Sequence, residues 1–526
     1  MSTKAIFVCR RSRSLLMADV AGQLNKDGTI DRSFATVIGD NLSSVTGLGG
    51  FDECYGEPDM YKPELDSLSK ERVRELTDRY DKNIFVWNAL FAERGLVCIE
   101  QDIYRPAKNL TMQQAEALIV KSLHYADKWI SQSKADFVFD ISALGLFRVS
   151  LMAAAEYYGI PYMFYAQAKL GERFTIYNDL FYRHDAIRER YLELSRMMPS
   201  DPRKDDGRKE KESVKKMASI YIGHDAEENL KKRKNGKQSA LARKTQSLFR
   251  PLHVGRNLYR QWLFMRKEEK RWKEEGLINY VDDRTRSGEV WTRRRKLSRR
   301  KKRNLEIINA KRADVSADLA RRPAVLYTWH LQPENSTSQL SPYHVNQEIS
   351  VQNIARVLPL NWVILVKPHR GTIDKVRPRE FEFLAGLPNV YFTDMETPTT
   401  QLIDRCEAVV TLTGTVGMEA LAMDKPVFYL GTASWGICNS AHYAASYEEL
   451  GNMLRNIDRY RPDPDDVASY FQAILDNSIE LPKGYEMTRA PEKYRGTPEY
   501  DSNIVVIARQ IASELERTRK VSQEVK

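Results

Sequence analysis

The sequence predicts an α/β protein with two doubly wound domains and a basic helical segment between them. The chain has 526 residues, which is more than a single hydrophobic core usually supports. Short apolar runs alternate with helical patterns in the first 200 residues, and the same alternation returns after residue 322. Strands separated by helices are typical of a parallel sheet that carries helices on both faces.

The first domain is expected over residues 1–200. A helical pattern follows the first apolar run through Leu24, and two more helical patterns cover 112–130 and 146–158. The apolar runs that we interpret as strands are AIFVC (5–9), FATVI (34–38), NIFVW (83–87), LVCIE (96–100), ADFVFDIS (135–142) and IPYMFYA (160–166).

The segment 201–322 holds the excess positive charge of the chain. It contains 37 Lys and Arg against 18 Asp and Glu, a net charge of +19, whereas the rest of the chain has a net charge of −8. One interpretation is a solvated helical insertion or hinge. The other is docking to anionic lipid or another polyanion, since each basic residue near an anionic leaflet contributes roughly 1 kcal/mol. No nucleic-acid-binding motif accompanies the charge, so nucleic acid is not an expected partner.

The second domain is expected over 323–480, with helices at 347–358, 399–406 and 415–423. Its predicted strands are PAVLYT (323–328), NWVILVK (361–367), NVYFT (389–393), AVVTLT (408–413) and PVFYLG (426–431). The remaining segment, 481–526, includes a helical pattern over 500–520 that is free to return to the first domain. We therefore expect two facing Rossmann-like domains, with ligands bound outside the carboxyl ends of the strands.

Composition excludes several other classes of protein. No run of 18 or more apolar residues is present, and the apolar run near the N-terminus is too short for a signal peptide. The five cysteines are scattered and include no CxxC pair, which argues against a disulfide framework or a zinc knuckle. These features predict a cytoplasmic protein, and the basic segment would allow it to dock at the inner membrane face.

The stretch TGTVGMEA (413–420) is the first candidate site. It places Thr413, Gly414, Thr415 and Gly417 between a strand and a helix, where unpaired N–H groups favour an anion and glycine permits a close approach. Glu419 lies four residues after Thr415, on the same helix face and roughly 6 Å along it. The pattern is suited to a phosphate and a ribose diol. A plain helix cap beside a surface glutamate would produce the same pattern.

Two further strand ends carry polar residues. VILVKPHRG (363–371) leaves Lys367 and His369 at a carboxyl end, where a lysine suits phosphate and a histidine can donate to a leaving group. The stretch 327–347 begins at the end of another strand. Five polar residues follow that strand closely: His330, Gln332, Glu334, Ser336 and Thr337. Loops after strands commonly hold ligand contacts, although either feature is also common on solvated surfaces.

The first domain offers weaker candidates on what would be the acceptor side. Ser12 and Arg13 follow the opening strand. Lys169, Glu172 and Arg173 follow the strand at 160–166. Each group has the hydrogen-bonding capacity to contact a polar acceptor, but neither forms a specific motif.

Together these stretches resemble the capsule polysaccharide biosynthesis family, which includes bacterial transferases that use CMP-activated 3-deoxy-manno-octulosonate (Kdo). The resemblance rests on the QPExST loop with the later Gln347, the KxH strand end, TGTVGMEAL before KPVFYLG, and GIPY…AKLGERF. It covers roughly 135–185 and 323–435. Two positions differ from the family pattern: Arg370 stands where proline is usual, and Lys169 where arginine is usual.

The resemblance implies the two-domain GT-B architecture and a set of roles. The nucleotide and its phosphate would contact Lys367, His369, Thr413, Gly414, Thr415 and Glu419. Gln332 and Glu334 would lie near the donor sugar. No cofactor is expected, since the nucleotide-sugar, with a CMP-sugar favoured, is a co-substrate.

We therefore expect an inverting, metal-independent glycosyltransferase that moves a sugar, with Kdo as one candidate, onto a surface-polysaccharide or glycolipid acceptor. The candidates for the proton acceptor are Glu334 and Glu172, and His369 is the candidate for assisting the leaving group. A nucleotide-sugar 2-epimerase or a polyol-phosphate transferase would use the same anion site. A non-catalytic scaffold docked on a membrane or polyanion is the alternative from a different class.

Overall fold

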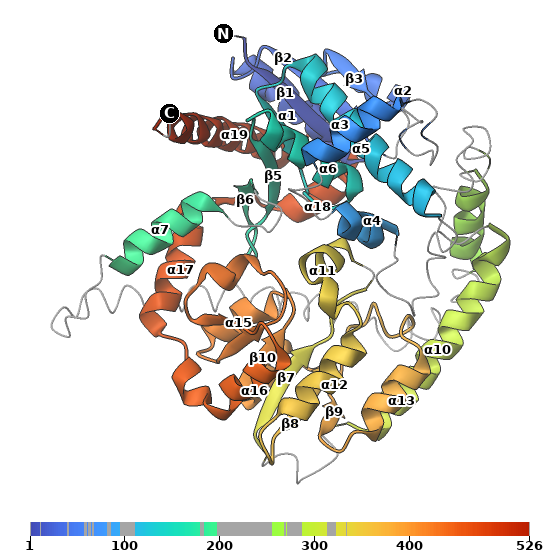
Figure 1. The fold of residues 1–526 in the computed structure, drawn as a ribbon, viewed down its shortest axis with the longest axis vertical. Helices are drawn as coiled ribbons and strands as arrows, with labels where there is room; N and C mark the ends of the chain where they lie inside the picture. The colour runs from blue at the N-terminus through green and yellow to red at the C-terminus, as the bar shows by residue number, and fades with distance from the viewer. Residues whose placement is uncertain are drawn as a thin grey trace. The chain divides into compact units, whose positions relative to one another are not determined.

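The computed structural model describes residues 2–10, 12–38, 42–56, 60, 65, 68–80, 86–94, 111–178, 184–196, 255–267, 270, 287–312, 322–332 and 334–524. The chain divides into two compact units (Figure 1). Unit 1 comprises Met1–Glu93, Leu110–Leu192 and Ala473–Lys526. Unit 2 comprises Arg94–Asn109 and Glu193–Gln472.

Unit 1 is built on a mostly parallel sheet with the order β13-β6-β5-β4-β1-β2-β3. β1 pairs in parallel with both β2 and β4, while β6 runs antiparallel to β5 and to β13. The strands are β1 (Lys4–Cys9), β2 (Arg32–Val37), β3 (Glu53–Tyr55), β4 (Phe137–Asp140), β5 (Tyr162–Gln167), β6 (Arg173–Tyr177) and β13 (Ile479–Glu480). The chain reverses its direction across the sheet between β1 and β4, so this is a topological switch point.

Helices cover both faces of this sheet, and each face has its own apolar core. Side chains of α3, α4, α5 and α6 pack on one face. Side chains of α1, α18 and α19 pack on the other. The helices are α1 (Arg13–Lys26), α2 (Leu42–Thr46), α3 (Lys70–Tyr80), α4 (Val86–Arg94), α5 (Met112–Ser133), α6 (Leu146–Tyr157), α7 (Asp185–Arg196), α18 (Gly484–Arg489) and α19 (Pro498–Glu524). Because both faces are covered, the central strands are continuous apolar runs rather than alternating ones.

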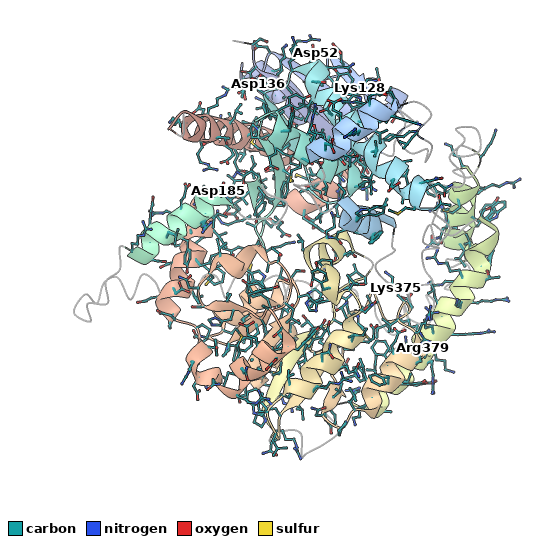
Figure 2. All side chains as sticks on the ribbon, in the orientation of Figure 1. Asp52, Lys128, Asp136, Asp185, Lys375 and Arg379 are labelled. Atoms are coloured by element: carbon teal, nitrogen blue, oxygen red, sulfur yellow. The ribbon has the colours of Figure 1, made fainter. Side chains whose placement is uncertain are left out.

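Carboxylates fix the amino ends of two strands of this sheet. Asp136 accepts a hydrogen bond from the backbone N–H of Lys4 at 2.7 Å, and Asp52 accepts one from Ser33, also at 2.7 Å. Both carboxylates are labelled in Figure 2. Two backbone N–H groups at the amino edge of the sheet are thereby satisfied by carboxylates.

Unit 2 contains a parallel sheet with the order β12-β11-β10-β7-β8-β9. Every recorded pairing in it is parallel. The strands are β7 (Ala324–Thr328), β8 (Val363–Lys367), β9 (Val390–Phe392), β10 (Ala408–Thr411), β11 (Val427–Tyr429) and β12 (Ala441–Tyr443). The order again reverses at the first strand, so the switch point lies between β7 and β10.

The helices of unit 2 also lie on both faces of their sheet. α10, α12, α13 and α16 supply the core on one face, while α14 and α15 contact strands of the sheet as well. α10 packs on α13 (Figure 1), and its buried Asn304 donates to the carbonyls of Ile373 and Val376 at 2.6 and 2.9 Å. The helices are α10 (Val290–Ala310), α11 (Asn335–Leu340), α12 (Gln347–Val357), α13 (Pro378–Gly386), α14 (Thr399–Arg405), α15 (Val416–Ala422), α16 (Tyr447–Arg455) and α17 (Pro464–Asp476).

The predicted fold class, with two Rossmann-like α/β units in one chain, is confirmed by the two doubly wound sheets. The prediction of a strand over 83–87 is wrong where the structure describes it, since Val86 and Trp87 begin α4. The predicted strand at 96–100 lies outside the described residues, as does most of the basic segment 201–322. Among the described helices, none combines the length and the apolar character needed to cross a membrane.

Candidate functional site

The candidate site of unit 2 lies at the carboxyl ends of β7, β8 and β10. These three strands are adjacent, and the switch point separates β7 from β10. The loop after β7 contains His330, β8 ends on Lys367, and the turn after β10 contains Thr413. In open parallel sheets this edge is where the adjoining loops separate and can receive a ligand.

His330 joins the two sides of the switch point. Its Nε2 lies 3.2 Å from Oγ1 of Thr411 and accepts the backbone N–H of Thr413 at 3.4 Å. Gln347, at the start of α12, accepts from the His330 N–H at 2.7 Å and donates to its carbonyl at 3.0 Å. Burial lowers the pKa of His330 to about 4, although Gln347 opposes the change. The imidazole is therefore neutral at physiological pH, with Nε2 as the acceptor.

Two glycines of the turn allow close packing by other side chains. A Cβ at Gly414 would lie 2.9 Å from Nε2 of His330. A Cβ at Gly417 would lie only 2.3 Å from the indole ring of Trp435, whose Nε1 donates to the Gly414 carbonyl at 3.1 Å. The sequence predicted both glycines as openings for a phosphate. The structure shows that each is also required by a neighbouring ring.

Thr415 and Glu419 lie on the same side of α15, as predicted. The N–H of Glu419 bonds to the carbonyl of Thr415 at 3.2 Å. Thr415 is exposed at the start of the helix and its side chain makes no capping hydrogen bond, while Glu419 is half-buried. α15 spans seven residues, so its dipole is small, and any ligand contact here would depend mainly on these side chains and the turn N–H groups.

Lys367 and His369 lie together after β8. Nζ of Lys367 donates to Oγ1 of Thr399 at 2.6 Å. Nδ1 of the exposed His369 accepts the N–H of Gly371 at 3.0 Å, so its Nε2 carries the hydrogen in the neutral ring. Burial lowers the pKa of His369, and the charges of Lys375 and Lys367 lower it further. The ring can therefore donate one hydrogen bond from Nε2.

Lys375 is a member of this cluster that the sequence did not predict. Burial lowers the pKa of Lys375, and the positive charge of Arg293 lowers it further. The negative charges of Asp374 and Glu334 act in the opposite direction. Lys375 therefore lies within electrostatic reach of both His369 and Glu334. Figure 2 labels Lys375, whose backbone carbonyl accepts a hydrogen bond from Arg300 of α10 at 2.9 Å.

The other predicted residues of unit 2 fall around this cluster. Glu334 is exposed and caps α11 through its backbone, since its carbonyl accepts from Ser338 at 2.9 Å. Gln332 is buried. Arg370, where the family usually has proline, forms an ion pair with Glu396 in the loop after β9.

In unit 1, Ser12 and Arg13 lie at the switch point between β1 and β4. Arg13 begins α1, and Arg148 of α6 holds Asp140 at the end of β4 through hydrogen bonds of 2.6 and 3.2 Å. Burial lowers the pKa of Arg13, and so do the charges of Arg148, Arg10 and Arg489, against the opposing effect of Asp140. Ser12 donates to the Arg489 carbonyl at 3.4 Å. The predicted acceptor side thus contains a group of arginines.

Lys169, Glu172 and Arg173 lie instead in a hairpin. β5 and β6 pair antiparallel, and Lys169 occupies the connecting turn with a φ of 63°. Glu172 accepts the N–H of Lys483 at 3.0 Å, and Arg173 donates to the Ser478 carbonyl at 2.8 Å. These two side chains therefore tie the hairpin to the C-terminal segment of unit 1.

The structure brings His369, Lys367, Glu334 and the 413–419 turn to one edge of unit 2, while Ser12, Arg13 and the hairpin belong to unit 1. Sequence reasoning named His330 without giving it a role, and it missed Lys375 and Trp435. A histidine directly after a strand was the available signal for the first. The other two come from loops whose position only the fold decides.

A cavity of about 570 Å³ lies elsewhere in unit 1, among α1, the loop at 48–50 and α19. None of the predicted site residues lines it. Within the described part of the chain, no group of three or more His, Cys, Asp or Glu side chains is placed to hold a metal ion.

Comparison with solved structures gives matches of low identity. A β-Kdo 2,7-transferase, KpsC of Thermosulfurimonas dismutans, is 11% identical over 73% of this chain and 97% of that chain, with a TM-score of 0.31. A UDP-GlcNAc 2-epimerase from Neisseria meningitidis, bound to UDP-GlcNAc, is 13% identical over 90% and 99%, with a TM-score of 0.26. Scores this low carry no argument about fold or function. No curated protein matches the sequence.

The family comparison is more informative. Residues 295–454 match the family described as capsule polysaccharide biosynthesis protein. The matched region contains β7 to β12 and the site residues from His330 to Glu419, and it covers about a third of the chain. Over this region, the chain is similar to the capsule polysaccharide biosynthesis family.

Proposed function

We propose that this protein is a glycosyltransferase that moves a sugar from a nucleotide-sugar to a glycan or glycolipid acceptor during synthesis of a capsule or other surface polysaccharide. The observation that carries the proposal is the cluster of Lys367, His369 and Lys375 after β8, on the same carboxyl edge of the unit 2 sheet as the 413–419 turn after β10. Three nitrogen donors at this edge suit a phosphate-bearing ligand.

The cluster would act on the leaving group. As the sugar departs, negative charge develops on the nucleotide phosphate, and donors that are already in place stabilise it without reorganising. Lys367 and Lys375 would supply positive charge, and Nε2 of His369 a hydrogen bond. Thr415 would contact the phosphate, and the Glu419 carboxylate would accept hydrogen bonds from ribose hydroxyls. A CMP-sugar, with Kdo as one candidate sugar, is the donor that the family resemblance favours.

Glu334 is the proposed proton acceptor for the attacking hydroxyl. It is exposed and lies within electrostatic reach of Lys375, and a carboxylate can take up the proton of an attacking hydroxyl. Glu172 is the weaker candidate, because it already accepts a backbone hydrogen bond in unit 1. In this proposal the reaction inverts the anomeric centre and needs no metal or cofactor.

The acceptor side is proposed at the arginines around Arg13 in unit 1. Guanidinium groups bind phosphate and carboxylate with two parallel hydrogen bonds, so an anionic glycan or lipid-linked acceptor suits them. Such an acceptor would be met at the cytoplasmic face of the inner membrane.

Nucleotide binding to the Glu419→Ala variant tests the proposal. Calorimetry with CMP, CDP, UDP and GDP should show that the native protein prefers one nucleotide. The variant should bind that nucleotide at least about tenfold more weakly. Asp404→Ala, which removes an exposed carboxylate of α14, is the matched control. Equal affinities for both variants would contradict the assignment.

Turnover separates the remaining alternatives. A nucleotide-sugar 2-epimerase converts the donor without any acceptor, and a polyol-phosphate transferase leaves phosphate in its product. Nucleotide binding without any turnover, measured across a panel of donors and acceptors, would favour the non-catalytic scaffold.

A further inference from the structure

The helix at 255–267 in unit 2 exposes large apolar side chains among cations. Tyr259, Leu263 and Phe264 are 54%, 44% and 54% exposed, while Met265 on the opposite side is buried. Arg256, Arg260 and Lys267 lie on the same exposed side, at helical spacings of three and four residues from the apolar ones. The helix contains no acidic residue, and no carboxylate pairs with these cations in the described part of the chain.

The aromatic residues of this helix pack on one another and on a neighbouring cation. The rings of Tyr259 and Trp262 stack with centroids 5.7 Å apart. The Arg266 guanidinium lies 5.2 Å from the centre of the Trp262 ring. The exposed Tyr259 is therefore part of a continuous group of aromatic and basic side chains.

α10 has the same chemistry on its outer side. Its inner side packs on the rest of unit 2, where Asn304, Ile307 and Ile308 are buried. Trp291 is 47% exposed at its first turn. The exposed cations for which the described residues provide no acidic partner are Arg294, Arg295, Arg299, Lys301 and Lys302.

We propose that the exposed sides of the 255–267 helix and of α10 dock on an anionic lipid bilayer. Arginine and lysine would contact the headgroup phosphates, and Tyr259, Leu263, Phe264 and Trp291 would enter the interface between headgroups and acyl chains. This inference extends the proposed function, since a lipid-linked acceptor lies at such a surface.

The apolar side chains decide between a bilayer and a soluble polyanion. A soluble acidic polymer such as heparin would be satisfied by the cations alone. Aromatic rings can also stack on nucleobases, but the aliphatic Leu263 gains burial only at an apolar interface. Helices that lie in a membrane interface combine basic residues with Trp, Phe and Leu on the exposed side. Long basic side chains can reach the headgroups while neighbouring apolar groups insert.

Vesicle sedimentation with the full chain tests the proposal. The protein should bind vesicles of phosphatidylcholine with phosphatidylglycerol, and bind vesicles of phosphatidylcholine alone at least roughly tenfold more weakly. Binding should also weaken as salt is raised, because exposed charges are screened.

Two triple variants separate charge from insertion. Arg294→Gln with Arg295→Gln and Arg299→Gln should reduce vesicle affinity roughly tenfold or more. Tyr259→Ser with Leu263→Ser and Phe264→Ser should reduce it at unchanged net charge. The matched control, Arg322→Gln with Arg459→Gln and Lys493→Gln, removes the same charge elsewhere and should bind like the native protein. Thermal unfolding and CMP calorimetry on all three confirm that each variant is folded.

Three results would overturn the inference: equal binding to neutral vesicles, full binding by the Tyr259 triple variant, or binding to heparin in place of vesicles. The last would assign the surface to a soluble polyanion. None of these readouts depends on turnover. A failure to bind vesicles would therefore contradict membrane docking without contradicting the glycosyltransferase proposal. Likewise, a failure to bind nucleotide would not contradict membrane docking.

Discussion

At the scale of single residues, His330 shows how the site is held together. Its ring accepts from the turn after β10, and its backbone is held by Gln347. The imidazole is thus a neutral link between two loops, and its burial has a free-energy consequence that depends on pH. In the unfolded chain the same ring has an ordinary pKa near 6.5, against about 4 in the folded protein.

The sign of the pH dependence follows from these two values. Above pH 6.5 both states hold a neutral ring and the stabilisation is complete. Between 6.5 and 4 the unfolded chain binds the proton and the folded chain does not, so stability is lost as the pH falls. The native protein should lose free energy of unfolding between pH 7 and pH 5, and we expect His330→Asn to make this loss smaller by roughly 2 kcal/mol.

Thermal or urea unfolding at the two pH values measures this difference. The pKa of His184 in unit 1 is also lowered by burial, to about 3, and contributes with the same sign. For that reason the native protein and the variant are compared at each pH. An unchanged pH dependence in the variant would show that burial does not lower the pKa of His330 in the folded protein.

Lys375 carries a second prediction at this scale. If Lys375 contacts a phosphate, Lys375→Ala should weaken nucleotide binding about tenfold. Raising the salt concentration should reduce this difference in affinity between the variant and the native protein, because salt screens the charge. Arg459→Gln, which removes an exposed cation from the same unit, should leave the affinity unchanged. Equal loss in both variants would point to a general effect of charge.

At the scale of elements, the junction of β10 and α15 is fixed by packing against Trp435. Its indole covers Gly417 and hydrogen-bonds the Gly414 carbonyl. The path of the turn, and with it the direction of Thr415 and Glu419, therefore depends on a loop that follows β11.

Gly417→Ala should lower stability by about 1–3 kcal/mol, because the added methyl group would overlap a ring that has little room to move. Gly386→Ala at the end of α13 is the control, since a Cβ there meets nothing within 4 Å. Differential scanning calorimetry of the two variants makes the comparison. A Gly417→Ala variant as stable as the control would mean that Trp435 is free to move aside.

At the scale of the whole molecule, the chain leaves unit 1, forms unit 2 and returns. β13 adds to the sheet edge beside β6, and α19 packs on α1. Ile511 of α19 is fully buried in this second core of unit 1, which also contains side chains of β1 from the other end of the chain.

Ile511→Ala should therefore destabilise unit 1 by about 2–4 kcal/mol, through lost burial and the cavity that remains. Nucleotide affinity, which we assign to unit 2, should not change. Glu516→Ala, at an exposed position on the same helix, controls for helix propensity. Calorimetric unfolding and nucleotide titration of both variants test the two statements separately, and a parallel loss of affinity would show that the units are coupled.

Local sequence patterns predict much of this architecture. Buried parallel strands are continuous apolar runs, so AIFVC, NWVILVK and AVVTLT predicted β1, β8 and β10 correctly. The short strands β3, β6, β12 and β13 were missed, and three of them, β3, β12 and β13, lie at sheet edges, where they lack the continuous apolar run of a central strand. The strand predicted at 83–87 failed where α4 begins, since a short apolar run fits a buried helix equally well.

The sequence by itself determined the two α/β units, their strand-end residues and the concentration of charge in one segment, because each depends on local periodicity and composition. The tertiary structure alone decided that His330 meets Thr413, that Lys375 joins Lys367 and His369, and that Trp435 covers Gly417. His330 and Thr413 are 83 residues apart in the chain, and strand order, which no local pattern encodes, brings them to one edge of the sheet. The residues of the other two groups are closer in sequence, but tertiary packing sets the path of the segments that contain Lys375 and Trp435.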